Sequence, residues 1–495
     1  MATDAQRGAR PTRRADTSLR PRTLLELWRS HIERHPDRPA LVDGAGASAP
    51  LRWGPLGERT AAAAAALVAA GARPGGRVLW RARPGVDAAL WIVGALRLGA
   101  VVVPVDPSLT PSEVAYVIDD VRPDVAVVDG VLEHAGLRTL GLADVGPGPA
   151  DADLPSLDGA APGDDALVVY TSGTTGTPKG AVHTHASLLA GVTSLGQAWG
   201  WGPEDRLILS LPLFHVHGLC AGLFGTLASG ASAVVFERFD ASEVARAATQ
   251  PETTMFFGVP TMYHRLTEAG AVRSLSSLRL CVSGSAPLPA ALWHRLARAG
   301  GVSVLERYGM SETLLTLSNP LQGERRPGSV GVPLPGVEAR IEDPDAGGVG
   351  QLLVRGPMLC RGYWERPQAS AAAWHNGWFA TGDLASVDGD GYYSIRGRLT
   401  ELIITGGHNV YPAEVEVVVA AHPSVLEVAV VGEPSEEWGE TVVAYVVGAP
   451  GGADVEGIRQ LAHTALASYK RPRDIRVVRA LPRNAMGKVV RSQLG

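Results

Sequence analysis

"LVVYTSGTTGTPKGAVHTH", Leu167–His185, joins an apolar run to a run of small residues that ends in a proline and a lysine. The valines and the tyrosine predict a strand, because β-branched and aromatic residues favour extended backbone. The loop that follows combines glycines, which permit close backbone approach, with hydroxyls and an ammonium, which suit a polyphosphate. The residues that could contact such a ligand are Tyr170, Thr171, Ser172, Gly173, Thr174, Thr175, Gly176, Thr177 and Lys179. The order of glycines and lysine fails the Walker template, GxxxxGK followed by Ser or Thr, so a surface turn stays an equal alternative at this point.

Length and composition limit the class of protein. A chain of 495 residues with 45% hydrophobic residues predicts a globular protein of two or three domains. A net charge of -5 gives no support to nucleic-acid binding, which needs a basic surface. The 3 cysteines, Cys220, Cys281 and Cys360, are odd in number and lie outside any CxxC pair. This pattern argues against a disulfide framework or a zinc site and favours a reducing, cytoplasmic location.

The N-terminal residues 1–22 are rich in arginine and are not followed by an apolar segment, so they do not form a secretory signal. A disordered tail is expected there, with a targeting arm as the alternative. The apolar segment Asp87–Val105 contains Arg97, Gly99 and Pro104, which interrupt it. A buried helix followed by a buried strand explains this segment better than a membrane span, so no membrane span is expected.

The pattern of apolar residues changes twice along the chain. From about residue 23 to 340, helix-like stretches alternate with short apolar runs, which predicts βαβ units and mostly parallel sheets. From about residue 347, short strands with tight turns predict a small barrel-like β region, in which "DGDG" at 388–391 is a hairpin turn rather than a calcium loop. After residue 398 a small α+β unit begins. The expected fold class is therefore α/β, with an N-terminal domain over 23–398 and a C-terminal domain over 399–495.

Lysine is rare in this chain, whose basic residues are almost all arginine. The lysines are Lys179, Lys470 and Lys488, and two of them lie in Gly- or Pro-flanked segments, "TPKG" and "AMGKVVR". A compact ammonium acts as a mobile point charge on a phosphate, which a planar guanidinium does differently. Lys179 and Lys488 are therefore candidate phosphate-contacting residues.

Six further segments follow the opening one in a fixed order. They are "LPLFHVHGL" (211–219), "VSGSAPL" (282–288), "ERYGMSET" (306–313), "GWFATGDL" (377–384), "GRLTELIITGGHNVYPAEVE" (397–416) and "LPRNAMGKVVR" (481–491). Together they resemble the adenylate-forming superfamily, which contains acyl-CoA synthetases, peptide-synthetase adenylation domains and luciferase-like enzymes. The resemblance covers nearly the whole chain after residue 22.

The resemblance implies an ATP-dependent ligase that makes an acyl-adenylate and then an acyl-CoA, with Mg²⁺ and with ATP and coenzyme A as substrates. Lys488 is implied as the catalytic lysine at the α-phosphate, and Glu312, with Thr171, as a magnesium ligand. Asp383 and Arg398 are implied at the ribose. The adenine site is implied by Tyr308 facing Ser285, Ala286 and Pro287, with Arg307, Gly309, Met310 and Ser311 beside it. The chemistry agrees, because joining two anions at the α-phosphate requires charge neutralisation.

The same resemblance implies a mobile C-terminal domain that presents a second surface for the thiol step. Gly406, Gly407, His408 and Asn409 would line the pantetheine tunnel. Arg238 would meet CoA phosphates, and Thr400 stands at the hinge, where relatives usually have Asp or Lys. Acetylation of Lys488 by a lysine acetyltransferase is a further expectation from the family.

The acid is suggested by "ERYGMSET", "HVHG", "SGSAPL" and "PGSVGVPLPGVE", which resemble the malonyl-CoA synthetase branch. Arg307 offers a two-pronged partner for a second carboxylate, and an ion pair with Glu306 or another surface acid is the alternative. His215, His217 and Ser283 would line the acyl pocket, and Met310 would abut the α-carbon, leaving room for methylmalonate. If the segment is extended, the two histidines share one face, which also suits a metal, although no third ligand is apparent.

Two other functions stay open from the sequence. One is a ligase for a short-chain or aryl monocarboxylic acid, and the other is a non-catalytic nucleotide-binding relative. The presence of Lys488, Glu312 and Asp383 together argues against the second.

Overall fold

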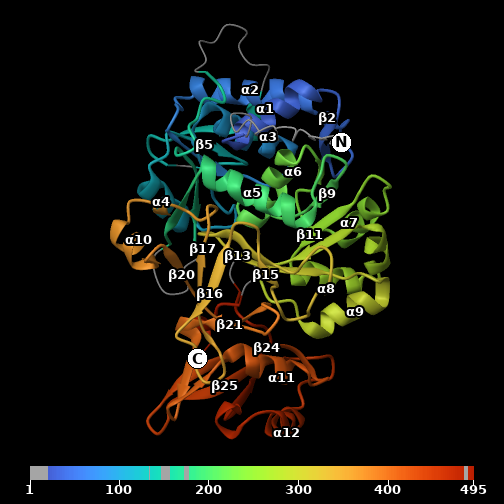
Figure 1. Cartoon of the computed structure of the whole chain (residues 1–495), viewed down its shortest axis with the longest axis vertical. Coiled ribbons are helices and arrows are strands. Elements are labelled where there is room, and N and C mark those ends of the chain that lie inside the picture. Colours follow the sequence, from blue (N-terminus) through green and yellow to red (C-terminus); the bar gives the residue numbers. More distant parts are fainter. Residues whose placement is uncertain (1–20, 133, 146–155, 172–177, 484–488, 495) are drawn as a thin grey trace, which may run out of the picture.

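The computed structural model describes residues 21–132, 134–145, 156–171, 178–483 and 489–494. Residues 1–20 of the expected tail, residues 172–177 of the opening loop and Lys488 lie outside the described residues. The chain forms a large N-terminal body and a smaller C-terminal unit below it in the view of Figure 1. This is the α/β architecture that the alternating pattern predicts.

One mostly parallel sheet forms around the strand of the opening segment. Its order is β18-β8-β7-β4-β3-β5-β6. The strands are β3 (Arg77–Arg81), β4 (Val101–Pro104), β5 (Val125–Val128), β6 (Arg138–Gly141), β7 (Asp165–Tyr170), β8 (Gly180–Thr184) and β18 (Gly362–Tyr363). β8 runs antiparallel to β7, and β18 runs antiparallel to β8. The predicted strand is therefore β7, and the residues after Lys179 return as its neighbour.

A second sheet contains nine strands in the order β15-β14-β13-β12-β11-β9-β10-β1-β2. The strands are β1 (Pro39–Asp43), β2 (Leu51–Arg52), β9 (Arg206–Leu209), β10 (Ser232–Val235), β11 (Met255–Gly258), β12 (Leu280–Ser283), β13 (Leu305–Met310), β14 (Leu314–Ser318) and β15 (Val332–Pro333). The five neighbouring pairs from β1 to β13 are parallel. The carboxyl ends of β9, β11, β12 and β13 therefore meet at one edge.

Helices cover both sheets. They are α1 (Leu24–Arg34), α2 (Trp53–Ala69), α3 (Val86–Leu98), α4 (Pro111–Val121), α5 (His185–Trp199), α6 (Gly225–Ala228), α7 (Ala241–Ala248), α8 (Pro260–Glu268) and α9 (Ala290–Gly300). One core unites the inner faces of both sheets with α1, α2, α3, α5 and the π-helix η3 (His217–Phe224). Side chains alternate along each strand, so the outer face of the nine-stranded sheet packs on α7 to α9 and that of the other sheet packs on α4.

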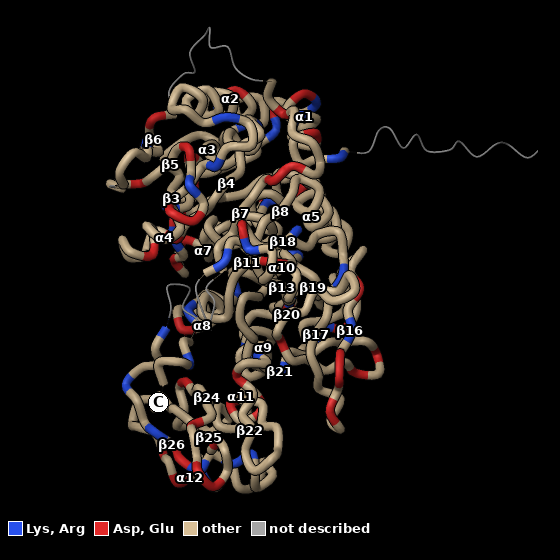
Figure 2. The backbone as a smooth tube through the Cα atoms, turned by 90° about the vertical axis from the view of Figure 1, so that its left-hand side faces the viewer, with Lys and Arg blue, Asp and Glu red and all other residues tan. Residues whose placement is uncertain are grey.

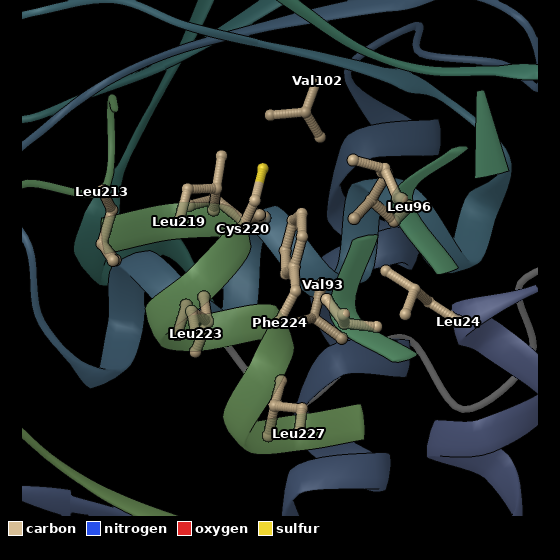
Figure 3. Close-up of a cluster of buried hydrophobic side chains, with 14 of the residues drawn as sticks. Leu24, Val93, Leu96, Val102, Leu213, Leu219, Cys220, Leu223, Phe224 and Leu227 are labelled. Carbon is tan, nitrogen blue, oxygen red and sulfur yellow. The ribbon is translucent and has the colours of Figure 1, made fainter. Parts of the chain in front are cut away.

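The helical segment 217–228 is buried deeply in the central core. Figure 3 shows Leu219, Cys220 and Phe224 in one apolar cluster with Val93 and Leu96 of α3 and Val102 of β4. The apolar segment Asp87–Val105 is thus buried within the protein core. It forms α3 followed by β4, as predicted, and Gly99 ends the helix with a φ of 80°. Within the described residues, no helix is both long and apolar enough to cross a membrane.

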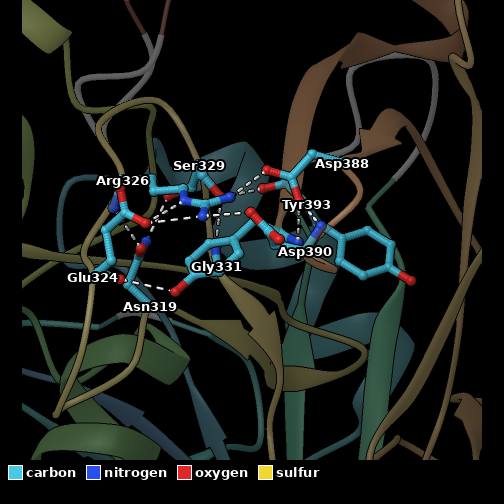
Figure 4. Close-up of polar contacts among 9 residues, drawn as sticks. Asn319, Glu324, Arg326, Ser329, Gly331, Asp388, Asp390 and Tyr393 are labelled. Carbon is cyan, nitrogen blue, oxygen red and sulfur yellow. Dashed lines mark hydrogen bonds and ion pairs between the residues drawn. The ribbon is translucent and has the colours of Figure 1, made fainter.

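Beyond the nine-stranded sheet the chain builds an antiparallel sheet from β16 (Glu338–Glu342), β17 (Gly350–Arg355), β19 (Trp374–His375), β20 (Trp378–Val387) and β21 (Tyr393–Arg398), with α10 (Pro367–Ala373) beside it. "DGDG" is the turn between β20 and β21, so the hairpin prediction is confirmed. Figure 4 shows Arg326 pointing at Asp388 and Asp390 of this turn, with both Nη–Oδ2 distances 2.7 Å. The turn before β21 is thereby fixed to the loop after β14.

The C-terminal unit has the sheet order β23-β22-β25-β24, with β26 beside β25. Its elements are β22 (Ile403–Thr405), β23 (His408–Val410), α11 (Pro412–Ala420), β24 (Val425–Ser435), β25 (Gly439–Gly448), α12 (Val455–Ala465) and β26 (Asp474–Val477). Figure 2 shows Lys and Arg interspersed with Asp and Glu along both units rather than gathered in one stripe. Many of these charges pair locally, as between Arg476 and Glu433.

Candidate active site

The predicted acyl and adenine residues lie in or after three strands of the nine-stranded sheet, β9, β12 and β13. His215 and His217 come after β9, Ser283 ends β12, Ser285 follows it, and Arg307 lies in β13. Because β9, β11, β12 and β13 are parallel, the segments after them lie at one edge, where open α/β sheets bind their ligands. The fold thus brings together residues that are up to 92 positions apart in the sequence, from His215 to Arg307.

Ser285 lies between two buried members of this group, His217 and Arg307. Its Oγ lies 3.4 Å from His217 Nδ1 and 3.5 Å from Arg307 Nη2. Ser285 itself has a φ of 69° and is exposed, whereas His217 is 3% and Arg307 5% exposed. A guanidinium and a neutral imidazole therefore both contact one serine hydroxyl at the edge of the sheet.

The Arg307 guanidinium lies directly against the backbone of Gly284. A Cβ on Gly284 would lie 2.3 Å from Arg307 Cζ, so only glycine leaves room for this rotamer. No carboxylate pairs with Arg307 among the described residues. Glu306 instead accepts hydrogen bonds from the backbone N–H groups of Leu288 (3.0 Å) and Gly328 (3.1 Å). The alternative of a Glu306–Arg307 ion pair is therefore wrong for this structure.

Several buried polar atoms of this group have no hydrogen-bond partner within the described chain. They are His215 Nε2, His217 Nε2, Ser283 Oγ and Arg307 Nε. Burial lowers the pKa of His215 to about 4 and the pKa of His217 well below its usual value, so both imidazoles are neutral at pH 7. Buried polar groups in native proteins are almost always satisfied, so unpaired donors around a buried cation fit an anionic ligand. We name His215, His217, Ser283, Ser285 and Arg307 the anion cluster.

The histidine segment is not extended. Residues 211–215 form a turn and Val216 enters the helical segment, with η3 beginning at His217; the Leu219 N–H donates to the His215 carbonyl at 2.8 Å. The condition for a shared strand face is therefore not met. A Cβ on Gly218 would lie 2.1 Å from the Pro212 carbonyl oxygen, so this turn needs glycine. The π-helix was not predicted from the sequence. Such helices are rare and are found mostly at functional sites.

Tyr308 points to the opposite side of β13 from Arg307. Its hydroxyl donates to Asp383 Oδ2 at 2.5 Å, and Arg398 Nε lies 2.8 Å from Asp383 Oδ1. The Asp383 N–H also donates to Thr381 Oγ1 at 3.0 Å. Burial opposes the charge of Arg398, yet Asp383 and Tyr308 raise its pKa. We name Tyr308, Asp383 and Arg398 the ribose cluster; Met310 lies beside it, with its Sδ 3.8 Å from the Tyr308 hydroxyl.

Glu312 lies just beyond β13 and is 6% exposed. The Tyr363 hydroxyl donates to Glu312 Oε1 at 3.0 Å, and burial raises the pKa of Glu312. At the phosphate loop, the Thr171 N–H donates to the Lys179 carbonyl at 2.9 Å and closes the loop stem. Glu312 and Thr171 offer hard oxygen atoms, and Mg²⁺ is typically held by one or two carboxylates plus substrate phosphates. The donor set therefore fits magnesium bound together with a nucleotide.

The remaining predicted residues occupy three places. Ala286 and Pro287 lie in the exposed loop after β12, Gly309 packs against the Leu314 carbonyl, and the Ser311 carbonyl accepts from His183 Nε2 at 2.7 Å. Arg238 is exposed after β10. Gly406 and Gly407 form the turn between β22 and β23 with positive φ, followed by His408 and Asn409, which are exposed. His408 stacks on Tyr469 with ring centroids 4.5 Å apart.

Two ion pairs bracket Thr400. On one side Arg398 pairs with Asp383, and on the other Glu401 pairs with Arg491 at 2.9 Å. Thr400 itself is exposed. The chain between the two pairs is thus Leu399 and Thr400.

Tyr363 is a site residue that the sequence reasoning missed. It lies 51 positions from Glu312 in the chain, and only the pairing of β18 with β8 brings it to the loop stem. The segment "GYW" at 362–364 carries no local pattern that signals this contact.

Comparisons with known proteins identify the family of this chain. The profile of the AMP-binding enzyme family matches residues 28–364, and that of the AMP-binding enzyme C-terminal domain matches residues 414–488. The mitochondrial malonate–CoA ligase ACSF3 of Mus musculus is 41% identical over 372 residues, which cover 66% of this chain and 64% of the mouse protein. Feruloyl-CoA synthase of an Amycolatopsis species is 36% identical and covers 90% of this chain and 93% of that one. Sulfoacetate–CoA ligase of Cupriavidus necator is 34% identical, with coverage of 95% and 97%.

Solved structures give the same assignment. ATP-bound MatB from Rhodopseudomonas palustris has a TM-score of 0.88 and 34% identity, covering 95% of this chain and 98% of MatB. A malonyl-CoA ligase ternary product complex with methylmalonyl-CoA and AMP has a TM-score of 0.67 and 41% identity, covering 90% and 97%. The relatives act on different acids, but all are CoA ligases or synthases. The chain belongs to the AMP-binding enzyme family, as an acid–CoA ligase that activates its acid through an acyl-adenylate.

Proposed function

We propose that the acid is malonate, with methylmalonate as a second substrate, so that the enzyme forms malonyl-CoA and releases AMP and pyrophosphate. The observation that carries this proposal is the buried Arg307, which has no carboxylate partner among the described residues. A guanidinium stays charged at neutral pH, and leaving it buried and unpaired is costly. A second carboxylate on the substrate would pair with Arg307, with Ser285 and the two histidines as neighbouring donors.

The relatives support a doubly anionic acid. Malonate and sulfoacetate each carry a second anionic group one carbon from the reacting carboxylate, and the names of two relatives contain these acids. Ferulate carries one carboxylate, so a monocarboxylic substrate is the competing function. Arg307 distinguishes the two, because a monoacid would leave it unpaired.

Each group of site residues then has its own task in the first half-reaction. Arg307 and its neighbours bind the distant carboxylate and orient the reacting one toward the α-phosphate. Asp383 accepts the ribose hydroxyls, and Lys179 with the loop 171–177 holds the β- and γ-phosphates. Lys488, outside the described residues, is proposed to neutralise the charge at the α-phosphate. Magnesium, held by Glu312 and Thr171, would supply further charge neutralisation there.

For the second half-reaction we propose that residues 399–495 rotate about Thr400 relative to residues 23–398. Gly406 to Asn409 would then face the pantetheine, and Arg238 the CoA phosphates. The TM-score is higher with the ATP-bound relative (0.88) than with the methylmalonyl-CoA product complex (0.67), despite lower sequence identity. This difference supports an arrangement suited to adenylation in the present structure.

Two minor expectations stay with the proposal. A cytoplasmic location fits the three buried free cysteines, although the mouse relative is mitochondrial. Acetylation of Lys488 stays a prediction, which mass spectrometry of protein from the native host would check.

A pyrophosphate-release screen tests the proposal. Malonate, methylmalonate, acetate, butyrate and ferulate are each supplied with ATP and magnesium, with and without CoA. Malonate is expected to give the highest kcat/KM by at least about 100-fold over acetate, because the unpaired Arg307 penalises monoacids. Equal turnover of acetate or ferulate contradicts the malonate assignment, and no pyrophosphate with any acid favours a non-catalytic relative.

A further inference from the structure

Tyr363 lies beside the outgoing limb of the phosphate loop because of strand pairing. β18 runs antiparallel to β8, with Tyr363 opposite Ala181, and the Trp364 N–H donates to the Gly180 carbonyl at 2.7 Å. Gly180 directly follows Lys179. The backbone of Tyr363 is thus fixed relative to the stem of the loop.

The side chain of Tyr363 contacts two oppositely charged groups with two different parts. Its hydroxyl donates to Glu312 Oε1 at 3.0 Å, and its ring centroid lies 5.2 Å from Lys179 Nζ. The second distance is within the range of a cation–π contact. Trp374 packs edge-on against the ring, with centroids 6.4 Å apart, and limits its rotation.

The hydroxyl matters because Glu312 is deeply buried. Among the described residues, Tyr363 is the only side chain that donates a hydrogen bond to the Glu312 carboxylate. One carboxylate oxygen is therefore held by Tyr363, which limits the orientations open to the carboxylate. Outer partners of this kind orient metal-binding carboxylates in proteins.

We propose that Tyr363 is a positioning residue for magnesium-bound ATP: its hydroxyl orients Glu312 and its ring positions the Lys179 ammonium. The inference rests on the proposed roles of Glu312 and Lys179 and is independent of which acid is used. It predicts that the hydroxyl and the ring affect nucleotide binding separately.

Calorimetric titration with ATP, in the absence of acid and CoA, tests this. Each protein is titrated once with excess magnesium and once with EDTA. Tyr363→Phe removes only the hydroxyl, so its affinity for ATP is expected to fall about tenfold with magnesium and to change less than twofold with EDTA. Tyr363→Leu also removes the aromatic face, so its affinity with EDTA is expected to fall about threefold as well.

Tyr392→Phe is the matched control. Tyr392 is another half-buried tyrosine, and its hydroxyl donates to the Glu324 carbonyl at 2.9 Å in the hairpin region. This variant is expected to bind ATP like the wild type under both conditions. In steady state, Tyr363→Phe should raise the KM for ATP and leave the KM for the acid unchanged.

A double-mutant cycle of Tyr363→Phe and Glu312→Gln tests whether Tyr363 acts through Glu312. If Tyr363 acts through Glu312, the double variant loses no more affinity for magnesium-bound ATP than Glu312→Gln alone. Wild-type affinity in Tyr363→Phe, equal losses with magnesium and with EDTA, or additive losses in the double variant overturn the inference. If Glu312→Gln itself binds magnesium-bound ATP normally, the proposed role of Glu312 fails and the inference fails with it.

Discussion

The anion cluster and the ribose cluster lie on opposite sides of the same strand, β13, and differ in how their polar groups are satisfied. In the ribose cluster Asp383 is held by Tyr308, Arg398 and the Thr381 hydroxyl. In the anion cluster the Arg307 side chain makes one hydrogen bond within the described chain, 3.5 Å long, to Ser285 Oγ, and several atoms around it have no partner there.

This difference separates a group that the protein has already neutralised from one that needs a ligand. We propose that the ribose cluster binds the ribose, which a preformed, mutually paired site suits. The acid differs between relatives, and we propose that a buried cation with no carboxylate partner among the described residues makes the choice of acid depend on the charge of the substrate. The two clusters should therefore respond to mutation in opposite ways.

Replacing Arg307 should have the largest effect on the choice of acid. Arg307→Leu is expected to lower kcat/KM for malonate about 100- to 1,000-fold, because it removes one partner of a buried charge pair with the substrate. Butyrate activity should be unchanged or higher. Pyrophosphate release measures both, and the exposed Arg273→Leu serves as control.

The same variant should not weaken the fold. Replacing a buried unpaired charge by an apolar side chain is neutral or stabilising by about 1–4 kcal/mol. A clear fall in the free energy of unfolding of Arg307→Leu would mean that Arg307 is paired within the protein. That result would contradict the contrast between the two clusters.

Asp383→Ala should weaken the fold and leave the choice of acid unchanged. It leaves Arg398 and Tyr308 without their buried partner, so the free energy of unfolding is expected to fall by about 3–5 kcal/mol. The KM for ATP should rise by the same factor with every acid, as measured by pyrophosphate release. Asp383→Asn, which keeps an acceptor for the Tyr308 hydroxyl, should recover part of the stability; a change in acid preference would contradict the separation of the two clusters.

The ionisation of Glu306 tests whether Arg307 lacks a carboxylate partner within the protein. Burial raises the pKa of Glu306 from 4.5 to about 7. Because the folded-state pKa lies above the unfolded value, the stabilising contribution is full below about pH 4.5 and is lost as the pH rises through about 7. The free energy of unfolding should therefore fall by about 3 kcal/mol more between pH 5 and pH 8 in the wild type than in Glu306→Gln.

Denaturant titrations at the two pH values measure this. An equal pH dependence in both proteins would place Glu306 in its ionised form and make an ion pair with Arg307 available. That result would remove the contrast between the two clusters.

The smallest effect is expected at Gly284. Gly284→Ala places a Cβ where the Arg307 guanidinium lies, so the guanidinium must move. We expect kcat/KM for malonate to fall about tenfold, equivalent to about 1.4 kcal/mol, with the KM for ATP within twofold. Gly196→Ala in α5, where a Cβ meets nothing within 4 Å, is the control. An equal loss in ATP binding would show that the loop after β12, rather than Arg307, had moved.

Much of the architecture could be predicted from local patterns. The alternation of helix-like stretches with short apolar runs predicted the parallel sheets. The positions of glycine and proline predicted α3 followed by β4, and the "DGDG" segment predicted the hairpin at residues 388–391. The last two features depend only on residues that are close in the sequence. The placement of Arg307 at a carboxyl-end cluster followed from the resemblance rather than from spacing.

What could not be predicted depends on segments that meet only in the folded chain. The turn and π-helix around His217 arise from close packing of Gly218 on Pro212, which no alternation encodes. Glu306 turns to backbone N–H groups of two distant loops instead of to Arg307. Tyr363 reaches Glu312 through the pairing of an edge strand from a different part of the chain.

The two ion pairs around Thr400 limit how the proposed rotation can occur. With Arg398 held by Asp383 and Glu401 held by Arg491, the joint consists of two residues and about four backbone dihedral angles. In the described arrangement the Tyr411 hydroxyl also donates to Asp345 Oδ2 at 2.7 Å across the two units. A hydrogen bond of this kind contributes about 1 kcal/mol, enough to change the ratio of the two orientations about fivefold. We therefore propose that this hydrogen bond shifts the balance between forming the adenylate and forming the thioester toward the described orientation.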